Sequence, residues 1–316
     1  MTILYGPHTQ VRRPQNIDFH SPLPIQIKIS DDVSTNMRNT RQTERRLGDI
    51  IRANLPPMLA ECVMFVLKQG WSALFGILLL CAIIGSRLIW NDHWAIARYD
   101  ALVIFAISTQ IAFLYFKLET WEEARVILLF HLTGTAMEIF KIYAGSWAYP
   151  GDGVLKIMQV PLFSGFMYAA VGSYMARVIR VFEMRFTPFP PFHWHLFLAA
   201  LIYVNFFAHH YLPDIRMVLF AATILLYART RIWFRMGTQS RFWWMPLPLA
   251  AFFSSFFLWL AENIGTLTKT WVYAGQTDGQ AVSFAKMGSW YLLLYVSFAT
   301  VTFVTRDAIY RQKCAP

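Results

Sequence analysis

Cysteine and charge are both scarce in this sequence. The three cysteines, Cys62, Cys81 and Cys314, are too few and too scattered for a disulfide framework and have no metal-ligating partner at short spacing. Charged residues make up 15% of the 316 residues, whereas hydrophobic residues make up 56% and the mean hydropathy is +0.40. A water-soluble domain of this length has no need of so much apolar surface. The composition therefore predicts an integral membrane protein.

Leader and cofactor motifs are absent as well. The first fifty or so residues contain no apolar core of a cleavable signal peptide, so we expect the first membrane helix to act as the targeting signal. No P-loop, dinucleotide fingerprint or Ser, His and Asp arrangement stands out, and the sequence identifies no cofactor. The net charge of +10 comes from short Lys and Arg clusters between apolar runs, as in cytoplasmic loops, so nucleic acid is not an expected partner.

The chain divides into a polar N-terminal part and a long apolar part. Residues 1–57 are predicted to be a mostly disordered cytoplasmic tail, and Met58–Lys68 to be an interfacial lead-in too short to span a membrane. Eight apolar runs follow: Trp71–Trp90, Tyr99–Leu118, Arg125–Ser146, Val154–Arg177, His195–Leu212, Ile215–Arg229, Trp244–Gly265 and Ala281–Thr305. We predict an all-α, polytopic membrane bundle of about eight transmembrane helices, in which the sixth run is short for a span of about 20 residues.

Lysine and arginine are unequally divided between alternate connections of this bundle. With the N-terminal tail inside, the inner connections hold twelve of these residues and the outer connections and adjoining helix ends hold seven. The positive-inside rule then places both termini in the cytoplasm, in the inner membrane of a bacterium. Membrane lipids are the expected surroundings.

A motif occurs twice in the chain, 124 residues apart. Glu138 and Glu262 are each followed by Trp after nine residues, Tyr after eleven and Gly after thirteen: Trp147, Tyr149 and Gly151, and Trp271, Tyr273 and Gly275. The copies occupy equivalent places in a four-plus-four arrangement, so we predict two parallel membrane repeats, residues 58–190 and 191–316. Four helices separate the copies, which places both motifs on one side of the membrane, the outer side by the charge distribution.

The two glutamates are the first candidates for a functional site. An ionisable side chain within a membrane span costs about 2.5 to 3.5 kcal/mol and usually faces a polar interior. We therefore predict Glu138 and Glu262 as catalytic residues. The predicted ligand-binding residues around them are His131, which shares a helix face with Glu138, together with Trp147, Tyr149, His209, Asn263, Trp271 and Tyr273.

Simpler interpretations of the same residues remain open. Glu138 can pair with Lys141 one turn away, and the tryptophans and tyrosines can be membrane-interface anchors. A cluster of both glutamates and one histidine of the His209 and His210 pair could bind a divalent metal, but no metal-binding pair such as HExxH supports one, and no metal site is predicted.

The stretch from Thr133 to Met167, with TGTAMEIFKIYAGSWAYPGDG and QVPLFSGFM, resembles a family of bacterial integral membrane proteins of unknown function. This resemblance covers roughly residues 98–306 and implies no activity. The chain also resembles membrane carotenoid hydratases and lycopene cyclase domains in Glu138, Gly145, Trp147, Tyr149 and Pro161. That second resemblance implies carboxyl groups that protonate an isoprenoid double bond.

Three functions fit these observations. The first is an enzyme that acts on a lipid-soluble, isoprenoid-like substrate by acid catalysis from a Glu-centred site near the outer membrane face. The second is a transporter of a small polar solute, with the same glutamates as coupling groups. The third is a structural or partner-binding membrane protein in which the glutamates are paired within the fold.

Overall fold

Ten α-helices make up most of the chain in the computed structural model, which describes residues 31–91, 93–237, 241–277 and 279–304. The helices are α1 (Asp31–Asn54), α2 (Pro57–Ser72), α3 (Leu74–Ile89), α4 (Arg98–Tyr115), α5 (Trp121–Tyr143), α6 (Phe163–Val181), α7 (Phe192–Ala208), α8 (Arg216–Tyr227), α9 (Leu247–Leu267) and α10 (Phe284–Val304). Each of the eight predicted apolar runs forms one helix, from α3 to α10 in order. The prediction of a helical membrane bundle is therefore correct in outline.

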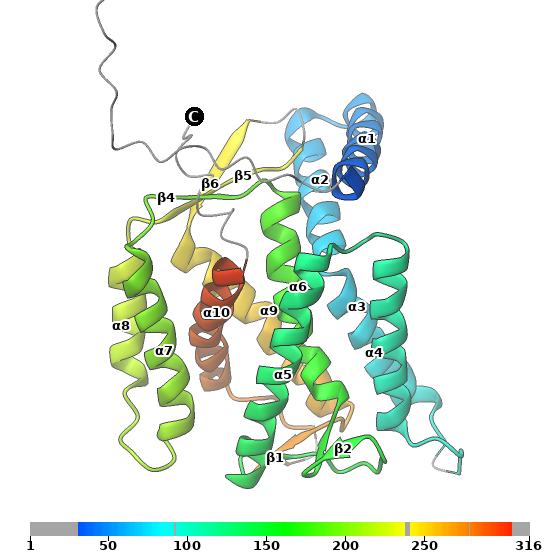
Figure 1. The fold of residues 1–316 in the computed structure, drawn as a ribbon, viewed down its shortest axis with the longest axis vertical. Coiled ribbons are helices and arrows are strands. Elements are labelled where there is room, and N and C mark those ends of the chain that lie inside the picture. Colours follow the sequence, from blue (N-terminus) through cyan, green and yellow to red (C-terminus); the bar gives the residue numbers. More distant parts are fainter. Residues whose placement is uncertain (1–30, 92, 238–240, 278, 305–316) are drawn as a thin grey trace, which may run out of the picture.

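Successive helices from α3 to α10 run in opposite directions between two ends of the bundle (Figure 1). One end carries α1 and the strands β4 (Arg185–Thr187), β5 (Arg231–Arg235) and β6 (Phe242–Pro246), and we call it the sheet end. The other carries β1 (Trp147–Ala148), β2 (Lys156–Ile157), β3 (Val160–Pro161) and β7 (Val272–Tyr273), and we call it the motif end. The connections that the charge count assigned to two sides thus lie at two opposite ends.

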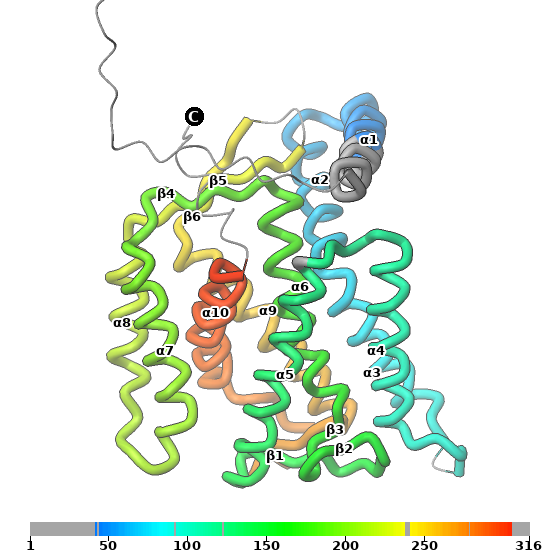
Figure 2. Tube along the Cα trace, in the orientation of Figure 1, coloured from blue at the N-terminus to red at the C-terminus, as the bar shows by residue number. Residues whose placement is uncertain are grey.

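Two helices form the centre of the bundle. α6 packs against α3, α4 and α5, and α10 packs against α7, α8 and α9. α6 and α10 also pack against each other, as the tube in Figure 2 allows the reader to follow. Close packing of α6 on α5 depends on Gly134 and Gly172, where a Cβ atom would lie 2.6 Å from Tyr168 and 2.7 Å from Phe130.

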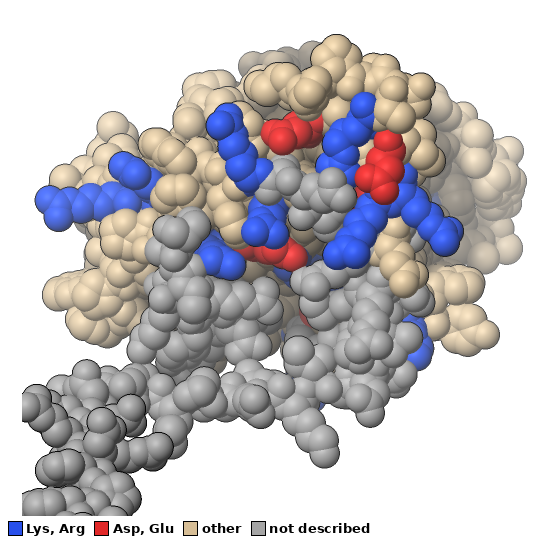
Figure 3. All heavy atoms as spheres, turned by 90° about the horizontal axis from the view of Figure 1, so that it is seen from above, with Lys and Arg blue, Asp and Glu red and all other residues tan. Residues whose placement is uncertain are grey.

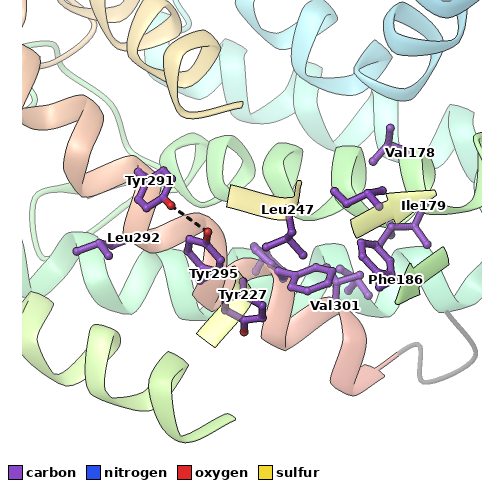
Figure 4. Close-up of a cluster of buried hydrophobic side chains, with 14 of the residues drawn as sticks. Val178, Ile179, Phe186, Tyr227, Leu247, Tyr291, Leu292, Tyr295 and Val301 are labelled. Carbon is purple, nitrogen blue, oxygen red and sulfur yellow. Dashed lines mark hydrogen bonds between the residues drawn. The ribbon is translucent and has the colours of Figure 1, made fainter. Parts of the chain in front are cut away.

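The largest buried apolar cluster lies between α6, α8, α10 and the strands of the sheet end (Figure 4). Tyr227 of α8 stacks on Tyr295 of α10 with ring centroids 5.0 Å apart, and the Tyr295 and Tyr291 hydroxyls are hydrogen-bonded at 3.0 Å. Phe186 of β4 and Leu247 at the start of α9 complete the same cluster. The core therefore joins the helices to the sheet.

Length and composition allow three helices to cross a membrane: residues Glu123–Tyr143 of α5, α9 and α10. α2 and α3 together qualify as a fourth span, bent by 69° at the break between them. α8 has 12 residues, about 18 Å at 1.5 Å per residue, against a hydrocarbon core of about 30 Å. Eight helices lie where eight spans are predicted, but among the described residues three or four candidate spans satisfy the length and composition expected of a span. The number of spans therefore stays a prediction.

Large apolar side chains cover the outside of the bundle. On α9, Leu249, Phe252, Phe253, Phe256 and Phe257 are each at least 37% exposed, and their spacing places them along one face of the helix. A soluble protein seldom exposes a contiguous apolar surface of this kind. Lipid hydrocarbon is the environment that suits such a surface. The protein is therefore a helical membrane protein.

The predicted all-α class omits seven short strands. β4, β5 and β6 form an antiparallel sheet in that order, in which Trp233 of β5 lies between Arg185 and Trp244. The alternation of β5, Arg-Ile-Trp-Phe-Arg, has the period of two that favours a strand with one buried face. The charge pattern predicts a cytoplasmic connection for β5, because its two arginines belong to a Lys and Arg cluster between apolar runs.

The predicted disordered tail is wrong for Asp31–Asn54, which form α1; residues 1–30 lie outside the described part. α1 packs against α2, and Glu44 lies 3.2 Å from the Lys68 ammonium. α2 is longer than the predicted lead-in and buries Met64, Lys68 and Ser72 in the bundle. The polar composition of α1 does not indicate a helix, because the surface that α1 packs against lies on α2.

Candidate functional site

Glu138 lies near the end of α5, buried with 2% of its surface exposed. Its Oε2 atom accepts hydrogen bonds from the Trp147 indole N–H at 2.7 Å and the Tyr149 hydroxyl at 2.9 Å. Its Oε1 atom accepts one from the Tyr168 hydroxyl of α6 at 2.7 Å. Three aromatic donors thus surround one carboxylate, and we call this set the Glu138 centre.

Glu262 lies near the end of α9, 7% exposed, in a second centre of the same kind. Its Oε2 atom accepts hydrogen bonds from the Trp271 indole N–H at 3.2 Å and the Tyr273 hydroxyl at 2.5 Å. The Trp290 indole of α10 lies beside the Glu262 carboxylate. We call this set the Glu262 centre; each centre takes a Trp and a Tyr donor from its own loop and one aromatic side chain from the next helix.

The equivalence of the two motifs extends to the backbone that carries them. α5 ends at Tyr143 and α9 at Leu267, residues 124 positions apart. Gly145 and Lys269, also equivalent, both have positive φ, 69° and 52°. In each copy the next residue returns a backbone hydrogen bond of 2.9 Å to the helix, from Ser146 to Lys141 and from Thr270 to Gly265. This helix-ending turn directs each tryptophan back towards its glutamate.

The two loops meet at the motif end of the bundle. β1 and β7 pair antiparallel, with Ala148 opposite Val272 and Trp147 opposite Tyr273. Ala148 and Val272 are themselves equivalent by the 124-residue offset, so a local two-fold axis passes between them. The predicted site residues of the two motifs therefore form one structure, although they are far apart in the sequence.

Aromatic rings connect the two carboxylate centres. Trp147 of the first contacts Tyr273 of the second edge-on, with ring centroids 5.8 Å apart. Tyr168 of the first lies 5.9 Å from Trp290 of the second. The sequence analysis missed Tyr168 and Trp290, which follow the glutamates by 30 and 28 residues and share no identity; a search for aromatic residues on the following helix would have found them.

The first turn of α4 fixes both loops. The Tyr99 hydroxyl accepts a hydrogen bond from the Gly151 amide at 3.0 Å and donates one to the Thr270 carbonyl at 2.8 Å. The Asp100 carboxylate accepts hydrogen bonds from the amides of Val154 and Leu155. A Cβ at position 151 would lie 2.9 Å from the Tyr99 ring, which explains the glycine there.

Burial keeps the loop tyrosines protonated. Removal from water, followed by the nearby glutamate charge, raises the pKa values of Tyr149 and Tyr273 well above their usual range. Both hydroxyls therefore act as hydrogen-bond donors to their carboxylates. Within the described residues, neither Glu138 nor Glu262 has an ammonium or guanidinium nitrogen within 4 Å, so neutral donors carry the polar contacts.

Lysines near the centres contact other groups. The predicted alternative of a Glu138–Lys141 pair is not what is seen: the Lys141 ammonium lies 2.9 Å from His210 Nε2 and 4.0 Å from the centre of the Phe206 ring. Lys286 of α10 lies 4.2 Å from the centre of the Tyr273 ring. The Glu262 centre therefore has a cation beside one of its donors.

Three predicted ligand-binding residues lie outside the two hydrogen-bonded sets. His131 packs on Phe166 two turns from Glu138. His209 bonds to the Asn205 carbonyl and stacks on His210. Asn263 bonds to the Trp259 carbonyl and to the amide of Val282, so it anchors the loop after β7. Adjacency in sequence to a glutamate did not place Asn263 on it, because neighbours on a helix point about 100° apart.

Other polar groups are buried towards the sheet end. Arg177 of α6 is fully buried, 2.6 Å from the Glu119 carboxylate, which also accepts hydrogen bonds from Ser173 and Gln110. Arg177 also reaches the Trp71 carbonyl at the break between α2 and α3. In the charge count, Arg177 is predicted only as one of the twelve Lys and Arg residues of the inner connections. No group of three metal-ligating side chains lies close together in the described part of the chain.

A groove lies beside the two centres. It runs between α5, α6, α7 and α10, has a volume of about 50 Å³, and is lined by side chains that include Phe130, Thr133, Tyr168, Tyr203 and Trp290. Tyr168 donates a hydrogen bond to Glu138, and Trp290 lies beside Glu262, so each glutamate is one side chain away from the groove. Its walls are otherwise mainly apolar.

Comparison with known proteins identifies relatives of unknown function. The family described as "Protein of unknown function (DUF817)" matches residues 61–298. The "Uncharacterized protein YoaT" of Bacillus subtilis (strain 168) is 39% identical over 245 residues, which cover 77% of this chain and 91% of that protein. These matches confirm the resemblance to a family of unknown function and give no support to the resemblance to carotenoid enzymes.

Solved structures with a related arrangement are a mycobacterial Insig homolog, MvINS from Mycobacterium vanbaalenii, and a cross-linked MvINS trimer. The first has a TM-score of 0.43 and 12% identity, covering 63% of this chain and 98% of that chain. The second has a TM-score of 0.43 and 13% identity, covering 59% of this chain and 95% of that chain.

Proposed function

The chain belongs to the DUF817 family, and we propose that it binds a lipid-soluble ligand in the groove between α5, α6, α7 and α10. The observation that carries this proposal is the double role of Tyr168 and Trp290, which line the groove and lie against the two glutamates, Tyr168 through a hydrogen bond to Glu138. An apolar groove with a few convergent polar groups is the usual form of a small-molecule site.

The size of the groove restricts what enters it. Its volume of about 50 Å³ is well below the roughly 300 Å³ or more of most small-molecule sites. A ligand that inserts one slender segment, with the rest in the bilayer, fits this volume. An isoprenoid or acyl chain has that shape, which favours a lipid-soluble ligand over a compact polar solute.

Acid catalysis on such a ligand would pass through Tyr168. Glu138 is separated from the groove by the Tyr168 ring, so its carboxyl group is not placed to touch the ligand directly. In the observed arrangement the Tyr168 hydroxyl donates to Glu138, so the proposed step begins with protonation of the Glu138 carboxyl and rotation of the Tyr168 O–H towards the groove. Tyr168 then gives its hydroxyl proton to a double bond of the ligand, and its oxygen takes the proton of the Glu138 carboxyl. The ligand then carries the positive charge and Glu138 the negative charge.

A structural role, in which the glutamates hold the fold together, is the competing function, and the hydrogen bonds of the two centres support it. Each carboxylate accepts hydrogen bonds from the Trp and Tyr of its loop, Glu138 accepts a third from α6, and the loops are joined by β1 and β7. Such a network stabilises the motif end whether or not a ligand binds.

We also propose that the two halves, residues 58–190 and 191–316, are parallel repeats with both termini in the cytoplasm. The equivalent helix ends, the local axis between Ala148 and Val272, and the matching positions of α6 and α10 support the repeat. The excess of lysine and arginine at the sheet end supports the orientation in a bacterial inner membrane. A C-terminal fluorescent-protein fusion that stays dark while an alkaline phosphatase fusion is active would refute that orientation.

The proposed ligand site can be tested by blocking the groove without touching a glutamate. Thr133 lines the groove, whereas its neighbour Leu132 does not and is 58% exposed. Protein purified in mild detergent is extracted and its bound lipids are compared by mass spectrometry and absorption. We expect a lipid-soluble compound in the native chain and in Leu132→Phe that is lost from Thr133→Phe.

The glutamates are tested in the same preparation. Loss of the compound from the Glu138→Gln and Glu262→Gln double variant, with the melting temperature kept within a few degrees, supports a ligand site. Equal lipid content in all four proteins contradicts the proposal. A lower melting temperature with unchanged lipid then assigns the glutamates to structure alone, and solute-uptake assays would examine transport.

A further inference from the structure

The sheet at the sheet end has two chemically different faces. Its inward side chains include Phe186, Ile232 and Phe234, all buried in the main apolar cluster. Because side chains alternate along a strand, Arg185, Arg231 and Arg235 project from the opposite face. The sheet therefore covers the end of the bundle and turns its arginines away from the core.

Aromatic rings hold these arginines in place. The guanidinium carbon of Arg231 lies 4.3 Å from the centre of the Trp244 ring, and that of Arg235 lies 4.3 Å from the Phe242 ring centre. Arg185 lies 4.8 Å from the same Phe242 ring. A guanidinium stacked on a ring has a restricted conformation, so it loses less conformational entropy when it binds an anion.

The outward face is strongly basic. Its eight residues, by strand register, are Arg185, Thr187, Arg231, Trp233, Arg235, Phe242, Trp244 and Pro246, which include three arginines and no acidic residue. The view onto the sheet end shows Lys and Arg side chains gathered there (Figure 3). Glu183, 3.8 Å from Arg235, is a nearby counter-charge. Like charges on neighbouring strands destabilise a sheet, and a bound anion relieves that repulsion.

The position of the face indicates where such an anion comes from. Arg231 lies opposite Pro246, the residue before α9, and the Leu247 amide donates a hydrogen bond to the Thr230 carbonyl at 3.0 Å. The exposed apolar face of α9, including Leu249, Phe252 and Phe253, begins within one turn of this point. Trp244, which is 48% exposed and packs against Arg231, lies three residues before the start of α9. Basic and aromatic residues directly above a lipid-facing helix are at the level of phospholipid headgroups.

We propose that the outward face of the β4–β5–β6 sheet binds the phosphate of an anionic phospholipid whose acyl chains lie along α9. The arginines supply charge and paired N–H donors, Trp244 packs at the headgroup, and the phenylalanines of α9 contact the chains. This site lies at the opposite end of the bundle from the carboxylate centres and does not depend on the proposed ligand groove.

The test is lipid binding by the purified full-length protein, measured by native mass spectrometry during titration with phosphatidylglycerol or phosphatidylcholine. We expect the Arg185→Gln and Arg231→Gln double variant to lose at least tenfold in apparent affinity for phosphatidylglycerol, with phosphatidylcholine binding unchanged. Arg87→Gln removes an exposed charge in the last turn of α3 and should bind both lipids as the native chain does.

A second variant keeps the test valid if the double variant does not fold. Phe253→Ala alters the α9 face without touching the sheet, and we expect it to weaken phosphatidylglycerol binding several-fold. Binding in both variants equal to that of Arg87→Gln overturns the proposal. So does equal affinity of the native chain for the two lipids, or displacement of phosphatidylglycerol by millimolar inorganic phosphate, which would indicate a site for a soluble anion.

Discussion

The Glu138 and Glu262 centres each take a Trp and a Tyr at the same spacing from their own loops, yet the two tryptophans pack differently. The ring of Trp271 lies directly against Gly265 of α9, where a Cβ atom would be 1.8 Å from the ring atom Cη2. The equivalent position in α5 is Lys141. Trp147 therefore has no glycine at the equivalent position of its own helix to pack against. It is half-buried and packs edge-on against Tyr273 of the other centre.

The same exchange of glycine for lysine changes the surroundings of the carboxylates. Lys141 extends away from Glu138 to His210 at the hairpin between α7 and α8. The Glu262 centre instead has Lys286 of α10 over its Tyr273 ring. The spacing of Trp and Tyr after each glutamate therefore determines which loop donors reach the carboxylate, whereas neighbouring helices determine the charge around it.

The largest effects are expected from the glycines that admit aromatic donors. Gly134→Ala places a Cβ 2.6 Å from the Tyr168 Cβ, which is fixed to the α6 backbone, so α5 and α6 must separate. Gly265→Ala displaces the Trp271 ring, which lies on a loop and can move. We expect both to lower the free energy of unfolding by about 1 to 3 kcal/mol, Gly134→Ala more, in SDS unfolding titrations.

Gly85→Ala is the matched control for these variants. Gly85 is also within a helix, but nothing lies within 4 Å of a Cβ built there. We expect it to leave stability unchanged or to raise it by up to about 1 kcal/mol, since alanine is the better helix former. Equal stability of all three variants would show that the close packing of Tyr168 on Gly134 and of Trp271 on Gly265 does not contribute to the stability of either centre.

Removing one hydroxyl from each centre should have an intermediate effect. Tyr149→Phe and Tyr273→Phe each delete a donor to a buried carboxylate, at a cost of about 1 to 3 kcal/mol. We expect the larger loss for Tyr149→Phe, because Lys286 remains beside the Glu262 centre. Unfolding titrations of the two variants measure the difference.

Tyr143→Phe serves as control, since Tyr143 ends α5 beside the same loop and is 86% exposed. Its stability should match that of the native chain. A loss for Tyr273→Phe that exceeds the loss for Tyr149→Phe would contradict the role given to Lys286.

The smallest effect is expected from Lys286 itself. Lys286→Gln removes a cation from the Tyr273 ring, which should cost under about 1 kcal/mol. In that background the Glu262 centre is left without a nearby lysine, so Tyr149→Phe and Tyr273→Phe should become equally destabilising. If the gap between them persists, another group distinguishes the two centres.

Much of the candidate site was predictable because its contacts are local. Glu138, Trp147 and Tyr149 lie within twelve residues, and one helix-ending turn brings them together. The internal match predicted an equivalent set of residues around Glu262, and Trp271 and Tyr273 of that set donate hydrogen bonds to it. Tyr168 and Trp290 were missed because the packing of α6 on α5 and of α10 on α9 selects them, and packing leaves no fixed spacing in the sequence.

His131, His209 and Asn263 show the limit of the same reasoning. Each was selected for its residue type near a glutamate or on a shared helix face. The structure gives them other partners: Phe166, the Asn205 carbonyl and the Trp259 carbonyl. A shared face aligns side chains in direction but leaves residues two turns apart at different depths.

The membrane character, the eight apolar helices and the two glutamate motifs follow from the order of the amino acids, because hydrophobicity and short-range spacing are properties of consecutive residues. The pairing of the motifs through β1 and β7, the packing of α1 on α2 and the sheet of arginine-rich strands arise only in the folded protein. Those features depend on hydrogen bonds and burial between segments distant along the chain, whose free energy exists only once the helices have packed.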